Sequence, residues 1–334
     1  MEDIILEVKN LRTYFELDEG TVRAVDGVDF TVKRGITLGI VGESGCGKSV
    51  TAMSILKIVD DPGKIVDGQV ILRNNGYTID LVALPEHSQE MRSIRGNEIA
   101  MVFQEPMNSL SPVHTIGNQI MEAVMLHNDV TKAQARERAV ELLGLVGIPN
   151  PDHRVDNYTF QLSGGMRQRA MIAMALSCNP ALLIADEPTT ALDVTTQAQI
   201  LELMKGLQDQ FGMAVMLITH DLGVVAETCD EVVVMYLGEV VEQADIDSLF
   251  YDPKHPYTQA LIRSIPRLGA GRTQELNPIE GSVPDPFNRP TGCPFHSRCD
   301  QFMAGKCDVI HPQLTTLEGG RTVRCLLYED VFPH

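Results

Sequence analysis

Apolar residues occur in short runs separated by Gly, Pro and charged residues, a pattern that favours many short strands. Apolar and polar residues alternate most clearly from Val28 to Val32, which is typical of a strand with one buried face. The runs Leu182–Ala185 and Met213–Thr219 are too short and too apolar for exposed helices, so we expect buried strands there. Further β-rich stretches cover residues 4–8, 22–32 and 68–72.

The middle of the chain, from about Glu86 to Gln161, changes to a helical pattern. Thr131 and Gln134 have the spacing of a capping box at the start of a helix. Apolar residues then recur at helical spacing in residues 135–146, and Gly147 follows as a stop signal. The sequence therefore predicts a mostly helical insertion within an α/β protein.

A different region begins after about residue 250, where three prolines interrupt the pattern: Pro253, Pro256 and Pro266. Its one clear helix is Tyr257–Ser264, and residues 268–292 form a loop rich in Pro and Gly. We therefore expect an α/β domain over residues 1–255, with a helical subdomain at about 86–165, and a C-terminal extension over residues 256–334.

Composition limits the classes of function. The 334 residues are 44% hydrophobic and suffice for a sizeable core, while the formal net charge of −18 argues against nucleic acid as a partner. We see no secretory signal, and no apolar run approaches the roughly 20 residues that span a bilayer. We expect a cytoplasmic protein, which could serve a membrane process only by docking onto other subunits.

The segment Gly42–Ser49 fits the phosphate-loop pattern GxxxxGK followed by Ser or Thr, between an apolar run and a helix-like stretch. Glycines let successive backbone N–H groups turn toward an anion, and the start of the helix adds positive potential. Lys48 supplies a point charge for the outer phosphates, and the Ser49 hydroxyl is expected to reach Mg²⁺.

An acidic pair, Asp186 and Glu187, stands at the end of a predicted buried strand, where open α/β sheets place their ligands. We expect Asp186 to hold Mg²⁺, through water, and Glu187 to polarise a water molecule that attacks the bound phosphate. About twenty positions earlier stands Leu162–Arg169, which begins Leu-Ser-Gly-Gly. The second buried strand leads to His220.

These motifs, in this order, resemble the ATP-binding-cassette (ABC) family, in which the Leu-Ser-Gly-Gly segment is the signature that closes over ATP held on a second cassette. The resemblance implies an ABC-type P-loop nucleotide-binding domain with a RecA-like core, an antiparallel β subdomain and an α-helical subdomain. It also implies an ATPase in which the catalytic residues are Glu187, His220, Gln104 and Lys48. Gln104 resembles the glutamine of the Q-loop and would contact Mg²⁺ together with Ser49 and Asp186.

The same resemblance implies which residues bind ATP. An aromatic residue would stack on adenine, and the spacing favours Phe15 over Tyr14. The phosphate-side residues would be Gly42, Ser44, Gly45, Gly47, Lys48, Ser49 and Val50. The residues that reach the nucleotide of the opposed cassette would be Ser163, Gly164, Gly165 and, in the segment that resembles the D-loop, Asp193.

The resemblance extends to one branch of the family. The blocks Gly164–Leu176 and Ala185–Thr195, the sequence His255–Thr258 and the Gly-Cys-x-Phe-x-x-Arg-Cys segment at Gly292–Cys299 resemble the D-type ATPase subunit of dipeptide and oligopeptide permeases. This implies a peripheral subunit on the cytoplasmic face of the membrane that powers peptide import. Its partners would be a second, non-identical ATPase, two permease subunits and, indirectly, an extracellular peptide-binding protein. Import of nickel or another small solute, or a non-transport ABC function, are the alternatives.

Four of the seven cysteines fall within the last 42 residues: Cys293, Cys299, Cys307 and Cys325. Cytosolic proteins rarely use structural disulfides, so the cluster indicates a metal site. The spacings match neither zinc ribbons nor bacterial ferredoxins, and four thiolates suit both Zn²⁺ and a 4Fe–4S cluster. The resemblance to the permease subunit implies the 4Fe–4S cluster.

Overall fold

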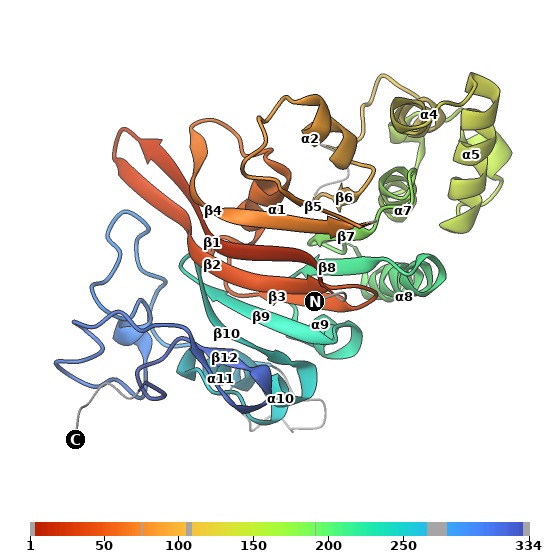
Figure 1. Ribbon diagram of the computed structural model, residues 1–334. Helices are drawn as coiled ribbons and strands as arrows, with labels where there is room; N and C mark the ends of the chain where they lie inside the picture. Colours follow the sequence, from red (N-terminus) through yellow and green to blue (C-terminus); the bar gives the residue numbers. More distant parts are fainter. Residues whose placement is uncertain (1–3, 75, 105–108, 191, 266–278, 330–334) are drawn as a thin grey trace. The chain divides into compact units, whose positions relative to one another are not determined.

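The computed structural model describes residues 4–74, 76–104, 109–190, 192–265 and 279–329 (Figure 1). The chain divides into two compact units. The first unit comprises Met1–Leu6, Val32–Thr37 and Leu72–Ile218, and the second comprises Glu7–Thr31, Leu38–Ile71 and Thr219–His334. Each unit is therefore assembled from separate stretches of sequence.

The first unit contains three short parallel strands, β6 (Ile99–Val102), β7 (Leu182–Asp186) and β8 (Ala214–Ile218). Every residue of β7 and β8 is buried, as their continuous apolar sequences predict. The register places Val102 beside Ala185, and Asp186 beside Ile218, so the three carboxyl ends lie at one edge. This unit also holds β5 (Tyr77–Asp80).

The helices of the first unit are α2 (Gln89–Ile94), α4 (Ile116–His127), α5 (Lys132–Leu145), α6 (Pro151–Arg154), α7 (Gly164–Ala175) and α8 (Val194–Phe211), with a 3₁₀ turn, η1 (Thr159–Gln161). Helices α4, α5 and α7 pack against one another (Figure 1). The predicted capping box starts α5: Thr131 N–H donates to Gln134 Oε1 at 2.9 Å, and Gln134 N–H donates to Thr131 Oγ1 at 3.4 Å. The helical insertion that the sequence predicts is present, but β6 lies within its range.

The second unit contains most of three long strands, β1 (Ile4–Leu17), β2 (Gly20–Lys33) and β4 (Gly63–Asn74), in the order β2-β1-β4. It also contains β3 (Thr37–Val41), which runs parallel to β9 (Glu231–Tyr236), and β10 (Glu239–Asp245), which runs antiparallel to β9. The helices here are α1 (Lys48–Leu56), α9 (Leu222–Thr228), α10 (Ile246–Tyr251) and α11 (Pro256–Arg263).

The C-terminal region belongs to the second unit and is poor in regular structure. After α11, which was predicted at residues 257–264, come η2 (His296–Arg298), β11 (Thr315–Thr316), η3 (Glu318–Gly320) and β12 (Thr322–Val323). Strand β12 pairs antiparallel with β10 through Glu242 and Val323, and β11 pairs with β12 (Figure 1). The extension therefore continues the sheet beyond β10. Pro266 and the first part of the predicted Pro- and Gly-rich loop lie outside the described residues.

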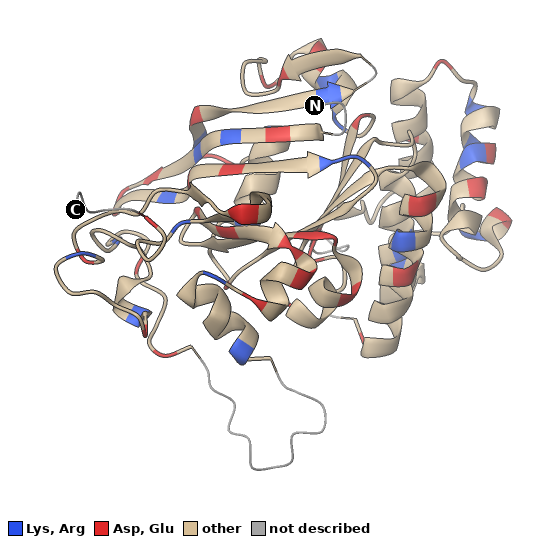
Figure 2. Ribbon diagram, turned by 60° about the horizontal axis from the view of Figure 1, so that its bottom comes forward, with Lys and Arg blue, Asp and Glu red and all other residues tan. Residues whose placement is uncertain are grey.

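Charged residues follow the acidic composition. Within the described ranges, Asp and Glu occur on helices, strands and loops alike (Figure 2). None of the helices in these ranges combines the length and apolar character that a bilayer-spanning segment requires.

Candidate active site

The predicted phosphate loop connects β3 to α1 in the second unit and depends on glycine at two tight positions. Gly42 has φ of 148° and Gly47 has φ of 97°, both in the region that residues with side chains avoid. A Cβ atom at Gly42 would lie 2.2 Å from the Met235 carbonyl oxygen, and one at Gly47 would lie 2.1 Å from that of Ala24. The backbone of neighbouring segments therefore closes on the loop in a way that only glycine permits.

Lys48, the first residue of α1, is only 6% exposed and spans the loop. Its Nζ donates to the carbonyl oxygens of Gly42 at 2.8 Å and Glu43 at 3.1 Å. Ser44 and Gly45 are exposed, whereas Ser49 and Val50 are half-buried in the first turn of α1. The loop thus has an exposed turn beside the amino end of a helix, and the Lys48 ammonium group contacts its backbone. These are features that an anion site requires.

Phe15 and His220 belong to the same unit. The Tyr14 hydroxyl donates to Asp26 at 2.7 Å, whereas the Phe15 ring packs against Gly63, and the choice of Phe15 over Tyr14 for stacking on adenine stays a prediction. Phe15 is half-buried, so part of its ring is accessible for stacking. His220 is exposed and follows Thr219, whose N–H donates to the Ile40 carbonyl of β3 at 3.2 Å.

The acidic pair lies at the end of β7 in the first unit. Asp186 is 4% exposed, and Glu187 has a left-handed backbone with φ of 45°. The Glu187 N–H donates to the Ile218 carbonyl oxygen of β8 at 2.9 Å, which fixes this unusual conformation. Its carboxylate accepts hydrogen bonds at Oε2 from Gln104 Nε2 at 3.0 Å and from the Thr190 hydroxyl at 2.9 Å. Two of the predicted catalytic residues, Gln104 and Glu187, are thus in direct contact.

The predicted signature residues begin α7, also in the first unit. Ser163 caps the helix by accepting a hydrogen bond from the Met166 N–H at 3.3 Å, and both Ser163 and Gly164 are exposed. A Cβ atom at Gly164 would meet nothing within 4 Å, whereas one at Gly165 would lie 2.9 Å from Thr196 Cγ2. Packing therefore accounts for glycine at position 165 but not at position 164.

Asp193, the last of the predicted nucleotide contacts, caps α8. Its carboxylate accepts from the Thr196 N–H at 3.0 Å and from the Thr196 hydroxyl at 2.7 Å. The hydrogen bond from the Thr196 side chain is the main reason that the pKa of Asp193 is lowered. A capping role alone would explain this residue, and a contact to nucleotide would be additional.

The four C-terminal cysteines line one small cavity of about 10 Å³ in the second unit, together with His255, Phe295 and His296. All four thiols are free of disulfides. Burial raises the pKa of Cys293 to about 12, and the other three cysteines raise it further through their charges. Burial likewise raises the pKa of Cys325 to about 11. The set is therefore close enough for its members to interact electrostatically.

A metal or cluster would draw on these four thiols. Among the residues that the structure describes, no three His, Cys, Asp or Glu side chains form a group positioned to hold a metal ion. The types of side chain nevertheless suit an iron–sulfur cluster or Zn²⁺, because four thiols and no carboxylate line the cavity.

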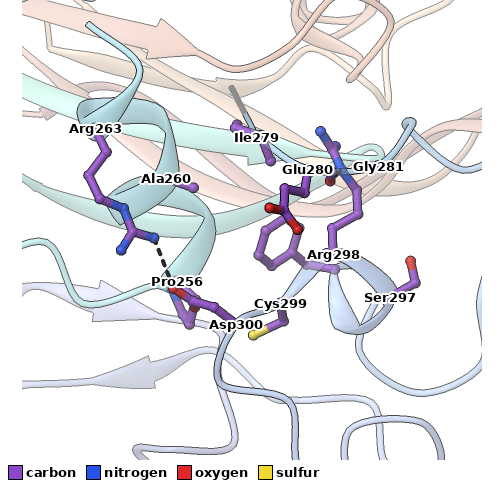
Figure 3. A pocket seen from close by; sticks show the side chains of 11 residues that line it. Pro256, Ala260, Arg263, Ile279, Glu280, Gly281, Ser297, Arg298, Cys299 and Asp300 are labelled. Carbon is purple, nitrogen blue, oxygen red and sulfur yellow. Dashed lines mark hydrogen bonds and ion pairs between the residues drawn. The ribbon is translucent and has the colours of Figure 1, made fainter. Parts of the chain in front are cut away.

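A wider cavity of about 610 Å³ adjoins the same segment and is lined by α11, residues 279–281 and residues 295–300 (Figure 3). Its two arginines already have acidic partners. Arg263 reaches Asp300 at 2.9 Å, as the dashed line in Figure 3 marks, and Arg298 pairs with Glu43 at 2.7 Å.

Comparison of the chain with known proteins identifies its family. A family described as "ABC transporter" matches residues 25–190, and one described as "Oligopeptide/dipeptide transporter, C-terminal region" matches residues 241–307. The oligopeptide transport ATP-binding protein AppD of Bacillus subtilis (strain 168) is 54% identical over 98% of this chain and 97% of its own length. The chain belongs to the ATP-binding proteins of the oligopeptide/dipeptide ABC transporters.

Other relatives of this ABC ATPase agree with that placement. The dipeptide transport ATP-binding protein DppD of Bacillus subtilis (strain 168) is 48% identical over 99% of this chain and 96% of its own length. A dimeric structure of the ATP-binding cassette MJ0796, in a post-hydrolysis state bound to ADP and Pi, covers 72% of this chain and 99% of that chain, with 29% identity and a TM-score of 0.64. The predicted cassette fold is confirmed, with mixed sheets. The predicted boundary at residue 255 stays a prediction.

The sequence predicted no contact for three residues that touch Glu187 or the phosphate loop of this ABC ATPase. Thr190 donates to Glu187, while Tyr257 and Arg298 both contact Glu43 of the phosphate loop. All three stand in segments that carried the resemblance, but the pattern alone gave them no partner. Their contacts join residues distant in sequence or depend on a hydroxyl orientation, and neither is visible in spacing.

The two tight glycines allow a direct test of the loop geometry. Gly47→Ala should destabilise the protein more than Gly45→Ala, because Gly45 has φ of 79° but nothing within 4 Å of its Cβ position. We expect a cost of about 1–2 kcal/mol at Gly45 from the left-handed backbone alone, and roughly 1–3 kcal/mol more at Gly47 from the steric conflict. Urea unfolding of both variants measures the difference, and equal midpoints would contradict the described packing.

Proposed function

We propose that this chain hydrolyses ATP to power the import of di- and oligopeptides through an ABC transporter. The observation that carries the proposal is identity of 54% over 98% of the chain with an oligopeptide transport ATP-binding protein, combined with an intact set of motifs. The assembled transporter would comprise this subunit, a second and non-identical cassette, two permease subunits and an extracellular peptide-binding protein. Such a subunit would work at the cytoplasmic face of the membrane without spanning it.

In the proposed mechanism, the loop Gly42–Ser49 binds the phosphates of ATP with its backbone N–H groups, and Lys48 neutralises the outer phosphates. Ser49, Asp186 and Gln104 would supply oxygen ligands for Mg²⁺ or for its water shell. Phe15 would stack on adenine. Support comes from the exposed turn of the loop and from the amino end of α1 beside it.

Glu187 would orient and deprotonate the attacking water, and His220 would contact the transferred phosphate. Support comes from the two hydrogen bonds that hold the Glu187 carboxylate, from Gln104 and Thr190. A positioned carboxylate is an effective base because its orientation costs no further entropy during the reaction. Gln104 could also relay the state of the permease, since it touches this carboxylate directly.

The signature would act on a second cassette. Ser163 and Gly164 are exposed at the amino end of α7, where backbone N–H groups and positive potential favour a phosphate. An open Cβ position at Gly164 is what close approach by a bound nucleotide would require. Gly165 and Asp193 lie at the neighbouring helix starts and would complete this surface.

We also propose that Cys293, Cys299, Cys307 and Cys325 hold a 4Fe–4S cluster, with Zn²⁺ as the alternative. Their shared cavity and mutual electrostatic effect support a common ligand. When bound, the cluster would join four distant points of a segment with little regular structure, and its role would be structural or regulatory. The hydrolytic residues all lie elsewhere in the sequence.

We predict that Glu187→Gln binds MgATP but hydrolyses it about 10²–10⁴-fold more slowly, because loss of a positioned base removes that factor. Steady-state phosphate release and equilibrium binding of MgATP measure the two quantities. Glu202→Gln, an exposed carboxylate on α8, is the matched control and should hydrolyse ATP normally. Turnover of Glu187→Gln at the rate of the unaltered chain would exclude Glu187 as the base.

We further predict that the isolated chain is a poor ATPase that becomes active when the transporter is assembled. A stabilising group supplied by a second subunit can raise phosphoryl transfer by about 10³–10⁵-fold. Specific activity should therefore fall on dilution and rise on adding the partner subunits. Full activity at concentrations where sedimentation shows only monomers would refute a shared site.

Protein purified without oxygen should be brown and contain about four iron and four sulfide per chain. Replacing any of the four cavity cysteines by Ser should bleach it and increase cleavage of the extension by protease, while ATP binding is largely kept. Cys178→Ser, which alters a cysteine outside the cavity, should stay brown. Colourless protein with one zinc per chain would select the alternative, and metal-free protein would remove both.

A further inference from the structure

The phosphate loop is held from outside by the C-terminal extension, and the contacts converge on Glu43. The Arg298 guanidinium makes two hydrogen bonds to the Glu43 carboxylate, from NH1 at 2.7 Å and from NH2 at 2.9 Å. The Glu43 N–H donates to the Tyr257 hydroxyl at 2.9 Å. The side chain and the backbone of one loop residue are therefore both bound by residues more than 200 positions away in sequence.

Arg298 is also held in place by residues outside the phosphate loop. Its side chain is 4% exposed, its Nε donates to the Glu280 carbonyl oxygen at 3.1 Å, and NH1 donates to the Tyr236 hydroxyl at 3.4 Å. The guanidinium carbon lies 5.9 Å from the ring centres of both Tyr236 and Phe295. Hydrogen bonding to Glu43 raises the pKa of Arg298, so its charge is constant over the working range of pH. A guanidinium held on several sides is a rigid support for a bidentate pair.

The contact continues into the phosphate-binding groups. The Glu43 carbonyl oxygen accepts a hydrogen bond from Lys48 Nζ at 3.1 Å, and Lys48 also reaches Gly42. Glu43 is thus contacted at its carboxylate, its N–H and its carbonyl oxygen, by Arg298, Tyr257 and Lys48 respectively. An unbroken set of hydrogen bonds runs from the cysteine-bearing segment to the lysine expected to bind phosphate.

We propose that Arg298 is a positioning residue for the phosphate loop, and that through Glu43 it sets the affinity of the chain for MgATP. The inference rests on the proposed role of Gly42–Ser49 in binding phosphate. Backbone N–H groups bind an anion well only when they are preorganised, because ordering them during binding subtracts from the affinity. Arg298 directly precedes Cys299, so this pair connects the segment that lines the cysteine cavity with the phosphate loop.

Loss of the bidentate pair between Arg298 and Glu43 should affect nucleotide binding rather than the chemical step. The Glu43 side chain is 26% exposed, so without its arginine the carboxylate can turn toward solvent and take the first turn of the loop with it. The hydrogen bonds of Arg298 go to Glu43, Glu280 and Tyr236, none of which is expected to take part in the chemical step, so that step should be spared. Loss of Arg298 should therefore raise the KM for MgATP far more than it changes kcat.

The test measures MgATP binding to the full chain by calorimetry, in the Glu187→Gln background so that nucleotide is not consumed. Arg298→Gln should weaken binding about tenfold, within the range of 5–150-fold typical of coupling between sites. Arg298→Lys keeps the charge without the fork and should recover part of the affinity. Glu43→Gln and the double variant should match Arg298→Gln, because the two residues act as one unit.

Arg263→Gln is the matched control, since Arg263 also pairs with an acidic residue at the same cavity but is separate from the loop (Figure 3). Its MgATP affinity should stay within about twofold of the background. If Arg298→Gln lowers only the unfolding midpoint and leaves the affinity of folded protein unchanged, the proposal is overturned. Additive effects of Arg298→Gln and Glu43→Gln would overturn it as well.

Lys48→Ala separates this inference from the function on which it rests. Loss of MgATP binding in Lys48→Ala together with normal binding in Arg298→Gln would reject the positioning role alone. Normal binding in Lys48→Ala would reject the assignment of the loop, and the inference with it.

Discussion

Burial of short strands on both faces is the constraint that decides where the candidate functional residues lie within each unit. Strands β3, β7 and β8 are buried at every residue, so their side chains must be apolar or small and their backbone groups must pair within the sheet. Functional polar residues can therefore lie only at or beyond the ends of these strands. Gly42 follows β3 directly, Asp186 ends β7, and His220 comes two residues after β8.

This constraint explains why much of the protein can be predicted from sequence. A continuous apolar run followed by glycine or carboxylate marks both the strand and the position of its functional residue. Strand β6 was missed because Ile99–Val102 is only four residues long and stands in a helical context. Its burial comes from pairing with β7, which is a long-range contact. The hydrogen bond between Gln104 and Glu187 depends on the same pairing, because it brings the two strand ends together.

The extension shows the limit of such prediction more clearly. Its cysteines are conspicuous in sequence, yet nothing in the sequence pattern specifies Glu43 as the partner of Arg298. The structure reveals a repeated use of arginine: Arg289 pairs with Asp26 and Glu239, and Arg298 with Glu43. Buried ion pairs of this kind add little net stability, but loss of one partner leaves the other charge buried and uncompensated. The pairs therefore determine which segments pack against each other. A region with few strands and helices can thus have a well-defined place in its unit.

The pairing of β12 with β10 has a consequence for how the chain can be divided. A strand at the end of a sheet exposes unpaired N–H and C=O groups, and these readily pair with strands of other molecules. The two-residue strand β12 covers part of β10, with Val323 beside Glu242 and Thr322 beside Gln243. A cassette cut before the extension would leave that edge open beside the apolar residues of β9 and β10. The extension therefore covers part of this sheet edge, which leaves fewer N–H and C=O groups of β10 open to strands of other molecules.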